Sequence, residues 1–251
     1  MKSFRLLPLA VFVLLTPASA FAKLPPVGSE VLDGSFAAKP VPMMALLAAM
    51  SLIPFAILML TSFSKIAVVL SIARSAMGSQ QIPPSTVLTG LAVILSVHVM
   101  APVFEDMWSE GKAALADGKA QDVDALFQAG TRAAAPLRAF LEKHGSLEDR
   151  AMFLDLAQQL RGEARAHEVS EKDIVVIVPA FVISELKGAF QIGFLVFLPF
   201  LVLDMVIANL LLALGMQSLS PTSVSLPFKL LLFVAVDGWS LLSQGLILGY
   251  R

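Results

Sequence analysis

The chain has 251 residues, of which 57% are hydrophobic and 15% charged, whereas soluble domains average about 45–50% and about 25%. Its 18 basic and 19 acidic side chains leave a net charge of −1, so no overall positive field exists to attract nucleic acid. Cysteine is absent and the three histidines are scattered. This excludes disulfides, thiol catalysis and cysteine-ligated zinc or iron–sulfur centres, and we expect no metal or other cofactor.

The first 22 residues have the pattern of a secretory signal peptide. Two basic residues precede an apolar run, Leu6 to Leu15, and Ala20-Phe21-Ala22 forms a cleavage site. The apolar run is too short to span a membrane, although an uncleaved anchor is the alternative interpretation. Cleavage would start the mature chain on the outer side of the membrane. Residues 23–42 contain Pro and Gly without periodicity, so we expect a flexible lead-in.

Charge is distributed unevenly along the rest of the chain. Of the 37 charged residues (18 basic plus 19 acidic), 23 lie within residues 105–173, which we call the charged block. Residues 40–64 and 75–104 carry none, and residues 188–228 carry only Asp204. A helix crosses the roughly 30 Å apolar core of a bilayer with about 20 apolar residues, so each of these stretches is long enough. The sequence therefore predicts an integral membrane protein.

A first pair of hydrophobic helices is predicted within residues 43–104. Its spans cover about Ala45 to Leu60 and about Val87 to Val103. The turn Gln80-Gln81-Ile82-Pro83-Pro84 separates them, because Pro-Pro cannot continue a helix. The two charges between the spans are both positive, which suits a cytoplasmic connection.

The charged block is predicted to be a helical domain on the outer side of the membrane. Its 14 acidic and 9 basic residues agree with the positive-inside rule. Ser146 to Asp149 resembles a capping box that opens a helix, and apolar residues recur at helical spacing. The apolar side chains expected to share helix faces are Val123, Leu126, Phe127, Leu137, Phe140, Leu141, Met152, Phe153, Leu156 and Leu160. No strand-like alternation occurs, so the whole protein is predicted to be all-α.

A second pair of hydrophobic helices is predicted within residues 174–251. Its spans cover about Ala189 to Met216 and about Leu230 to Tyr250, which leaves the C-terminus outside. The segment Gln217 to Lys229 bears many hydroxyl groups and no charge before Lys229. It is either a re-entrant or pore-facing turn or an ordinary connector.

Asp204 and Asp237 lie inside the predicted spans, where a carboxylate costs about 2.5–3.5 kcal/mol. Two such residues are compatible with an intramembrane aspartyl protease whose aspartates share one proton. The interpretation that we favour is neutralisation by ion pairs within or between subunits, in which Glu185, Lys187 and Lys229 take part.

Small residues at a spacing of four favour close packing of helices. Gly245 and Gly249 form one such pair, and Ala189 and Gly193 form another. No phosphate-binding glycine loop, HExxH or GxSxG sequence occurs. An energy-coupling ATPase is therefore predicted not to reside in this chain.

Several long strings resemble the FliP/SctR family. In the first half these are Thr61 to Lys65, Val68 to Leu70, Arg74 to Ala76, Gly78 to Pro84 and Met100 to Val103. In the second half they are Ser184 to Lys187, Ala189 to Gly193, Leu198 to Asp204, Ser225 to Phe233 and Asp237 to Trp239. Together they cover most of residues 51–239 apart from the charged block.

This resemblance implies a core subunit of the export gate of type III secretion systems in the bacterial inner membrane, which is not an enzyme. Family members are made with four hydrophobic segments around an extracytoplasmic helical domain. Several copies, taken to be five, assemble with FliQ/SctS-like and FliR/SctT-like subunits into a helical ring that passes unfolded proteins. FlhB/SctU-like and FlhA/SctV-like export components and membrane lipid are the further partners implied.

Family members often carry a run of methionines after the third hydrophobic segment, which seals the closed pore. The resemblance therefore places a constriction at Met216, Gln217, Ser218 and Leu219, where one methionine remains. Met fills irregular gaps well, whereas Gln and Ser are wetted more easily, so either Met216 and Leu219 make the seal or another subunit supplies it. Gln80 to Pro84 and the C-terminal Leu246 to Tyr250 favour the injectisome branch, whereas the signal peptide points to the flagellar branch.

Six charged residues are expected to fix subunit packing as buried charges: Lys65, Glu185, Lys187, Asp204, Lys229 and Asp237. Two other functions compete with the export gate. One is an intramembrane aspartyl protease that uses Asp204 and Asp237. The other is a small-solute transporter, which would show an internal repeat, but the two halves of this sequence are not similar.

Overall fold

The computed structural model describes residues 44, 51, 54–55, 57–79, 82–116, 123–162 and 165–251. Apart from Met44 and Ser51, they all belong to one unit of the chain, Leu52–Arg251. The predicted signal peptide, the lead-in and most of the first predicted span lie outside the described residues.

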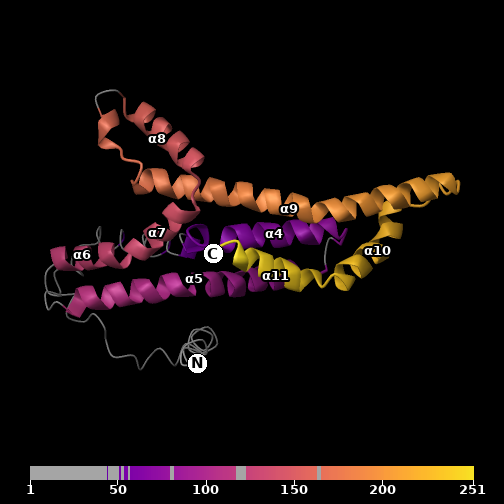
Figure 1. Ribbon diagram of the computed structural model, residues 1–251, viewed down its shortest axis with the longest axis horizontal. Helices are drawn as coiled ribbons and strands as arrows, with labels where there is room; N and C mark the ends of the chain where they lie inside the picture. Colours follow the sequence, from indigo (N-terminus) through magenta and orange to yellow (C-terminus); the bar gives the residue numbers. More distant parts are fainter. Residues whose placement is uncertain are drawn as a thin grey trace. The chain divides into compact units, whose positions relative to one another are not determined.

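The described part consists of helices joined by turns and contains no strand, which confirms the all-α prediction (Figure 1). The elements are α4 (Phe63–Ala76), α5 (Ser85–Ala116), α6 (Val123–Ala133), α7 (Ala135–His144), α8 (Leu147–Arg161), the short 3-10 helix η2 (Ala166–Glu168), α9 (Ile174–Ala213), α10 (Pro221–Ala235) and α11 (Gly238–Leu248). Within these residues, α5 and α9 are long and apolar enough to cross a membrane, and a third span results if α10 and α11 are one bent span.

The longest helix is α9, which has 40 residues. At 1.5 Å per residue it is about 60 Å long, twice the apolar core of a bilayer. It begins at Ile174, about four turns before Ala189, where the predicted span starts. Glu185 and Lys187 lie in these first turns, and each has a partner of opposite charge.

Helix α5 exceeds its predicted end at Val103 and runs to Ala116. Its last turns carry charged residues and belong to the charged block, where α6 and α7 pack against α5 and where α7 and α8 pack against α9. Phe140 and Leu141 are buried, as their spacing predicted. The α8 stripe of Met152, Leu156 and Leu160 is exposed, because the less exposed residues of α8 lie about a third of a turn further round the helix, at Arg150, Phe153, Leu154, Ala157 and Gln158, while Asp149 is buried in the first turn. This stripe has no covering element within the described residues.

The last two helices correct the prediction for residues 217–250. Only residues 214–220 form the connection after α9, because Pro221 starts α10 at its first position, where a missing N–H costs nothing. The predicted fourth span is broken into α10 and α11, which are bent by 58°. Asp237 lies at the break in a left-handed conformation, with φ at 51°, and it cannot continue a right-handed helix.

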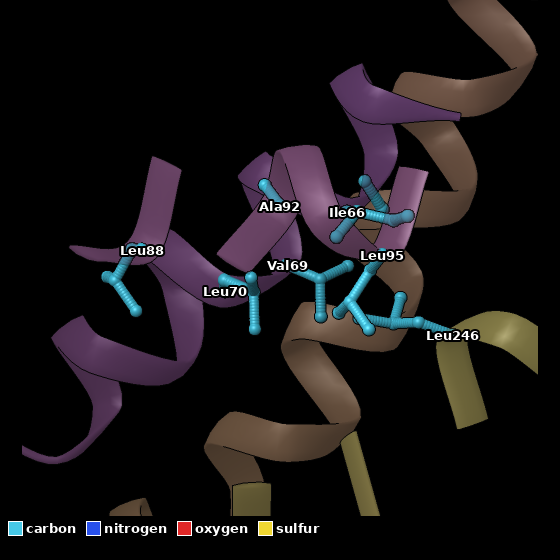
Figure 2. Close-up of a cluster of buried hydrophobic side chains, with 8 residues drawn as sticks. Ile66, Val69, Leu70, Leu88, Ala92, Leu95 and Leu246 are labelled. Carbon is cyan, nitrogen blue, oxygen red and sulfur yellow. The ribbon is translucent and has the colours of Figure 1, made fainter. Parts of the chain in front are cut away.

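A short helix fills the centre of the packing. With 14 residues, α4 is about 21 Å long and too short to cross a bilayer. Figure 2 shows its residues Ile66, Val69 and Leu70 among side chains of the neighbouring helices. The cluster is completed by Leu88, Ala92 and Leu95 of α5, Ala189 of α9 and Leu246 of α11. Helices far apart in the sequence are thus held together by one apolar core.

The small residues Ala189 and Gly193 let α9 approach α4 closely. Ala189 is fully buried, and a Cβ atom at Gly193 would lie 2.4 Å from Ile72 Cδ1 and 3.1 Å from Ile72 Cβ. A Cβ atom added at Gly245 would have no atom of another helix within 4 Å. A Cβ atom added at Gly249 would meet only the backbone of its own helix, with Gly245 O at 3.3 Å. The first pair therefore packs helices within the chain, whereas the second pair has no helix against it in the described part.

We expect Gly193→Val to destabilise the isolated chain by about 2 kcal/mol, because the new side chain overfills the contact with Ile72. Gly245→Val is the matched control, since it makes the same change in an apolar helix at a position with open space. The measurement is the thermal midpoint of the detergent-solubilised protein by size-exclusion chromatography. Equal midpoints for the two variants would contradict the close approach of α4 and α9.

Candidate functional site

Three groups of paired charges connect the apolar helices. In the first, Lys65 Nζ of α4 lies 3.0 Å from Glu185 Oε1 of α9, and the side chains are 15% and 2% exposed. The Tyr250 hydroxyl donates to Glu185 Oε2, and its ring centroid lies 4.8 Å from Lys65 Nζ. Gly188 leaves room for the lysine, because a Cβ atom there would lie 3.1 Å from Lys65 Cε. This group joins α4, α9 and the end of the chain.

The second group joins α9 to α10. Lys229 Nζ lies 2.6 Å from Asp204 Oδ2, and Ser225 Oγ donates to Asp204 Oδ1 at 2.6 Å. Lys229 and Ser225 are buried, whereas the Asp204 side chain is 34% exposed. Asp204, which lies within the apolar run of α9, is thus neutralised by Lys229 of its own chain, one of the residues proposed as its partner from the sequence.

The third group ties the charged block to α9. Lys187 Nζ lies 2.5 Å from Asp149 Oδ1, and Ser184 Oγ and Ser146 Oγ donate to Asp149 Oδ2 at 2.6 and 2.8 Å. Ser146 also caps α8, since its Oγ accepts from the Asp149 N–H at 3.0 Å, as predicted. Burial by itself raises the pKa of Asp149, but the hydrogen bonds from Lys187, Ser184 and Ser146 outweigh it and hold that pKa below its usual value.

This third group corrects the prediction for Lys187. Its side chain is 55% exposed rather than buried, and its partner is an aspartate of the charged block rather than one in a span. Asp149 was not among the predicted site residues, because 38 residues separate it from Lys187. Its position as the last residue of the predicted capping box, Ser146 to Asp149, was the only signal in the sequence.

The two aspartates that a protease would need do not form a dyad. Lys229 and Ser225 engage Asp204. Asp237 is exposed at the break between α10 and α11, and within the described residues its carboxylate has no ion pair or hydrogen bond. A shared proton requires two carboxyl groups in contact, which this arrangement does not provide. No cluster of three metal-ligating side chains occurs among the described residues either.

The residues of the predicted constriction form the connection between α9 and α10. Met216, Gln217, Ser218 and Leu219 are all exposed, and the left-handed Gly215, with φ at 71°, ends α9 before them. No element of the described chain covers this connection. Their place at the tip of a helical hairpin leaves them available to other molecules (Figure 1).

His144, at the end of α7, is a neutral residue of the packing. Its ring centroid lies 4.6 Å from that of Phe140 and 5.0 Å from that of Tyr250. Burial, and then the positive charges of Lys143 and Lys65, lower its pKa from 6.5 to about 4. The folded chain therefore binds fewer protons at this residue than the unfolded chain between pH 6.5 and pH 4.

We expect the protein to lose about 2 kcal/mol of stability through His144 as the pH falls from 6.5 to 4. The folded state holds the pKa of this histidine below its unfolded value, so its contribution to the free energy of unfolding is fully present above pH 6.5 and is lost as the pH falls towards 4. His144→Phe should remove this part of the pH dependence. His167→Gln, at an exposed histidine, is the control and should retain it. Thermal midpoints in detergent at pH 7.5 and pH 4.5 measure the difference, and an unchanged pH dependence in His144→Phe would refute it.

Exposed large apolar side chains occur in the first turn of α9 and again from Phe190 to near its end. They are Ile174, Val175, Phe190, Phe194, Leu195, Leu198, Leu201, Val202, Met205, Val206, Leu210 and Leu212. Soluble monomers rarely expose such a surface. The structure therefore defines a helical membrane protein that neutralises most of its intramembrane charges internally and leaves its apolar faces for other molecules to cover.

Comparison with known proteins gives the family. The FliP family model matches residues 46–246, and the chain belongs to this family, as its motifs predicted. The hypersensitivity response secretion protein HrcR of Ralstonia nicotianae is 44% identical over 203 residues, which are 81% of this chain and 94% of that protein. Yop proteins translocation protein R of Yersinia pestis is 44% identical over 207 residues (81% and 93%). The flagellar biosynthetic protein FliP of Bacillus subtilis is 41% identical over 207 residues (82% and 90%).

Proposed function

We propose that this chain is one of several identical subunits of a type III secretion export gate, which pass unfolded proteins across the bacterial inner membrane. Its family supports the assignment to this system, since its relatives are named as secretion, translocation and flagellar biosynthetic proteins. These relatives serve both injectisomes and flagella at similar identity. The injectisome branch remains our preferred assignment on the strings named above.

The observation that carries a subunit role is apolar surface exposed beyond the length that lipid covers. From Phe190 to Leu212, α9 exposes apolar side chains over about 33 Å, which is close to the apolar thickness of a bilayer. Ile174 and Val175 in the first turn of α9, about 24 Å before Phe190, are exposed as well, and so is the α8 stripe of Met152, Leu156 and Leu160. We assign these side chains, which lie outside that length, to contacts with neighbouring subunits. This proposal includes five copies around a channel, joined by FliQ/SctS-like and FliR/SctT-like subunits.

The proposed orientation puts the charged block on the periplasmic side. Its acidic excess supports this side, since positive charges accumulate in cytoplasmic connections. The block is not an independent appendage, because α7 and α8 pack on the first turns of α9 and Asp149 binds Lys187. A force on the block is therefore transmitted directly to α9.

Two differently tagged copies of the chain, co-expressed with the other export-gate subunits, test the proposal. We expect one tag to recover the other in a complex of defined stoichiometry, and mass measurement of that complex counts the copies. A fully active monomer in lipid, recovered without its second copy, would overturn the proposal.

The proposal places the narrowest part of the channel at Met216, Gln217, Ser218 and Leu219. Met216→Ala is expected to raise ion leakage through the closed complex several-fold, because the flexible side chain fills gaps that water would otherwise occupy. Met205→Ala, at an exposed methionine in the middle of α9, is the control. Leakage measured in planar bilayers should rise only in Met216→Ala, and equal leakage in both variants would place the seal elsewhere.

A further inference from the structure

Seven charged side chains belong to the apolar segments 54–104 and 174–250: Lys65, Arg74, Glu185, Lys187, Asp204, Lys229 and Asp237. Five of them form ion pairs within the chain, Lys187 with Asp149 of the charged block. The other two, Arg74 and Asp237, have no ion pair or side-chain hydrogen bond in the part of the chain that the structure describes. Within the described parts of these apolar segments, each chain thus has one unpaired cation, Arg74, and one unpaired anion, Asp237.

Arg74 lies in the last turn of α4 and is half-buried. It lines a recess of about 60 Å³ together with Ser71, Ser85, Leu88 and Thr89. The hydroxyls of Ser71 and Thr89 donate to carbonyl oxygens of their own helices, and in the described part of the chain neither hydroxyl oxygen accepts a hydrogen bond from the guanidinium. A cation near a helix C-terminus is favourable, but this explains neither the choice of Arg nor its fork of unused donors.

Asp237 stands at the break between α10 and α11. Its left-handed conformation is one that Asp and Asn adopt more readily than other non-glycine residues, which explains the small side chain but not its charge. An apolar recess of about 220 Å³ adjoins it at Val236 and Gly238, and a second of about 360 Å³ adjoins it at Trp239. A carboxylate beside such surfaces is costly without a cation.

Leu88 of α5 connects the surroundings of the two residues. It lines the recess that holds Arg74, and it also lines the larger apolar recess together with Trp239, two residues after Asp237. Arg74 and Asp237 do not pair with each other within the described chain, and their charges are complementary. Identical chains arranged side by side can bring such a pair together across an interface.

We propose that Asp237 of one subunit binds Arg74 of the adjacent copy. This inference rests on the proposed homo-oligomer and names one contact in its subunit interface. An Arg–carboxylate pair is charge-assisted and can be bidentate, which fixes the orientation of two chains as well as neutralising both groups. One such pair at each interface neutralises both residues in every subunit that has neighbours on its two sides.

Cysteine cross-linking tests the contact directly, because the chain has no cysteine of its own. One tagged copy carries Arg74→Cys and a second, differently tagged copy carries Asp237→Cys, and both are co-expressed with the other export-gate subunits. We expect a short bis-maleimide to join the two tags covalently. The matched control replaces Arg74→Cys by Arg251→Cys, at an exposed cation that ends the chain.

Recovery of each tag with the other before cross-linking establishes that the copies assemble, which is the test of the proposed function alone. Assembly without a cross-link between positions 74 and 237, or a cross-link only in the control, overturns this inference and leaves the proposed function intact. Because the cysteine variants themselves remove the proposed contact, assembly is judged with two differently tagged wild-type copies, and its absence there overturns both.

A double-mutant cycle separates pairing from a conformational role. Arg74→Gln and Asp237→Asn should each lower recovery of the two-tag complex about tenfold, whereas Arg74→Lys, which keeps the charge, should retain most of it. The double variant should be no worse than either single variant, because both lose the same contact. Unchanged recovery in Asp237→Asn, or strictly additive losses in the double variant, would show that the two residues do not bind each other.

Discussion

Replacing Lys65 by Met is expected to lower the stability of the protein by about 3–5 kcal/mol, because it leaves a buried carboxylate without its cation. Glu185 is only 2% exposed, and its remaining partner is the Tyr250 hydroxyl. A group in that position cannot recover its hydration by a small rearrangement. The loss should loosen α4, α9 and the end of the chain together, since all three meet at this carboxylate.

The second variant Lys65→Met/Glu185→Gln tests the cause. The amide keeps an acceptor for the Tyr250 hydroxyl and carries no charge, so most of the stability should return. Thermal midpoints of the two variants in the same detergent give the comparison. A double variant as unstable as Lys65→Met alone would mean that the lysine acts through its packing beside Gly188 rather than through its charge.

The elements of this fold were predictable where local rules decide them. Ser146 caps α8 because a hydroxyl before a helix accepts a free N–H, and this rule requires no knowledge of the rest of the chain. The Pro-Pro turn before α5 and the apolar core of α9 follow from similarly local causes. The structure confirms these features.

Helix ends and side-chain exposure were predicted less well, because distant residues decide them. The predicted span starts at Ala189, after Lys187, yet α9 begins at Ile174, and Asp149 of another helix neutralises Lys187. The break at Asp237 depends on one backbone conformation that an aspartate can adopt but does not require. The exposed stripe of α8 has the spacing of a buried face, but no element of the described chain covers it.

The site was predictable in its residue types but not in its pairing. The rule that a charge in an apolar helix needs a partner selected Lys65, Glu185, Asp204 and Lys229, and the structure pairs them two by two. Arg74 lies in the same predicted connection as Lys65 and was not selected. In the described part of the chain it is, with Asp237, one of the two charged residues of the apolar segments that have no ion pair.

We expect Lys229→Met to lower stability by about 3 kcal/mol and to prevent recovery of the assembled complex. Lys229 is buried, and Asp204 would keep only Ser225 Oγ as a hydrogen-bond donor. The effect should be somewhat smaller than at Lys65, because water reaches the Asp204 side chain more easily than it reaches Glu185. Thermal midpoints and recovery of the two-tag complex measure it.

The variant Asp204→Asn/Lys229→Met serves as its control and also separates the export gate from the protease. Removing both charges should restore folding, assembly and protein export together, because the pair is structural in an export gate. In a protease, Asp204→Asn would abolish the activity even when the complex forms normally, because an amide cannot exchange the catalytic proton. A complex that assembles at wild-type levels in this double variant but exports nothing would therefore refute the structural role of Asp204.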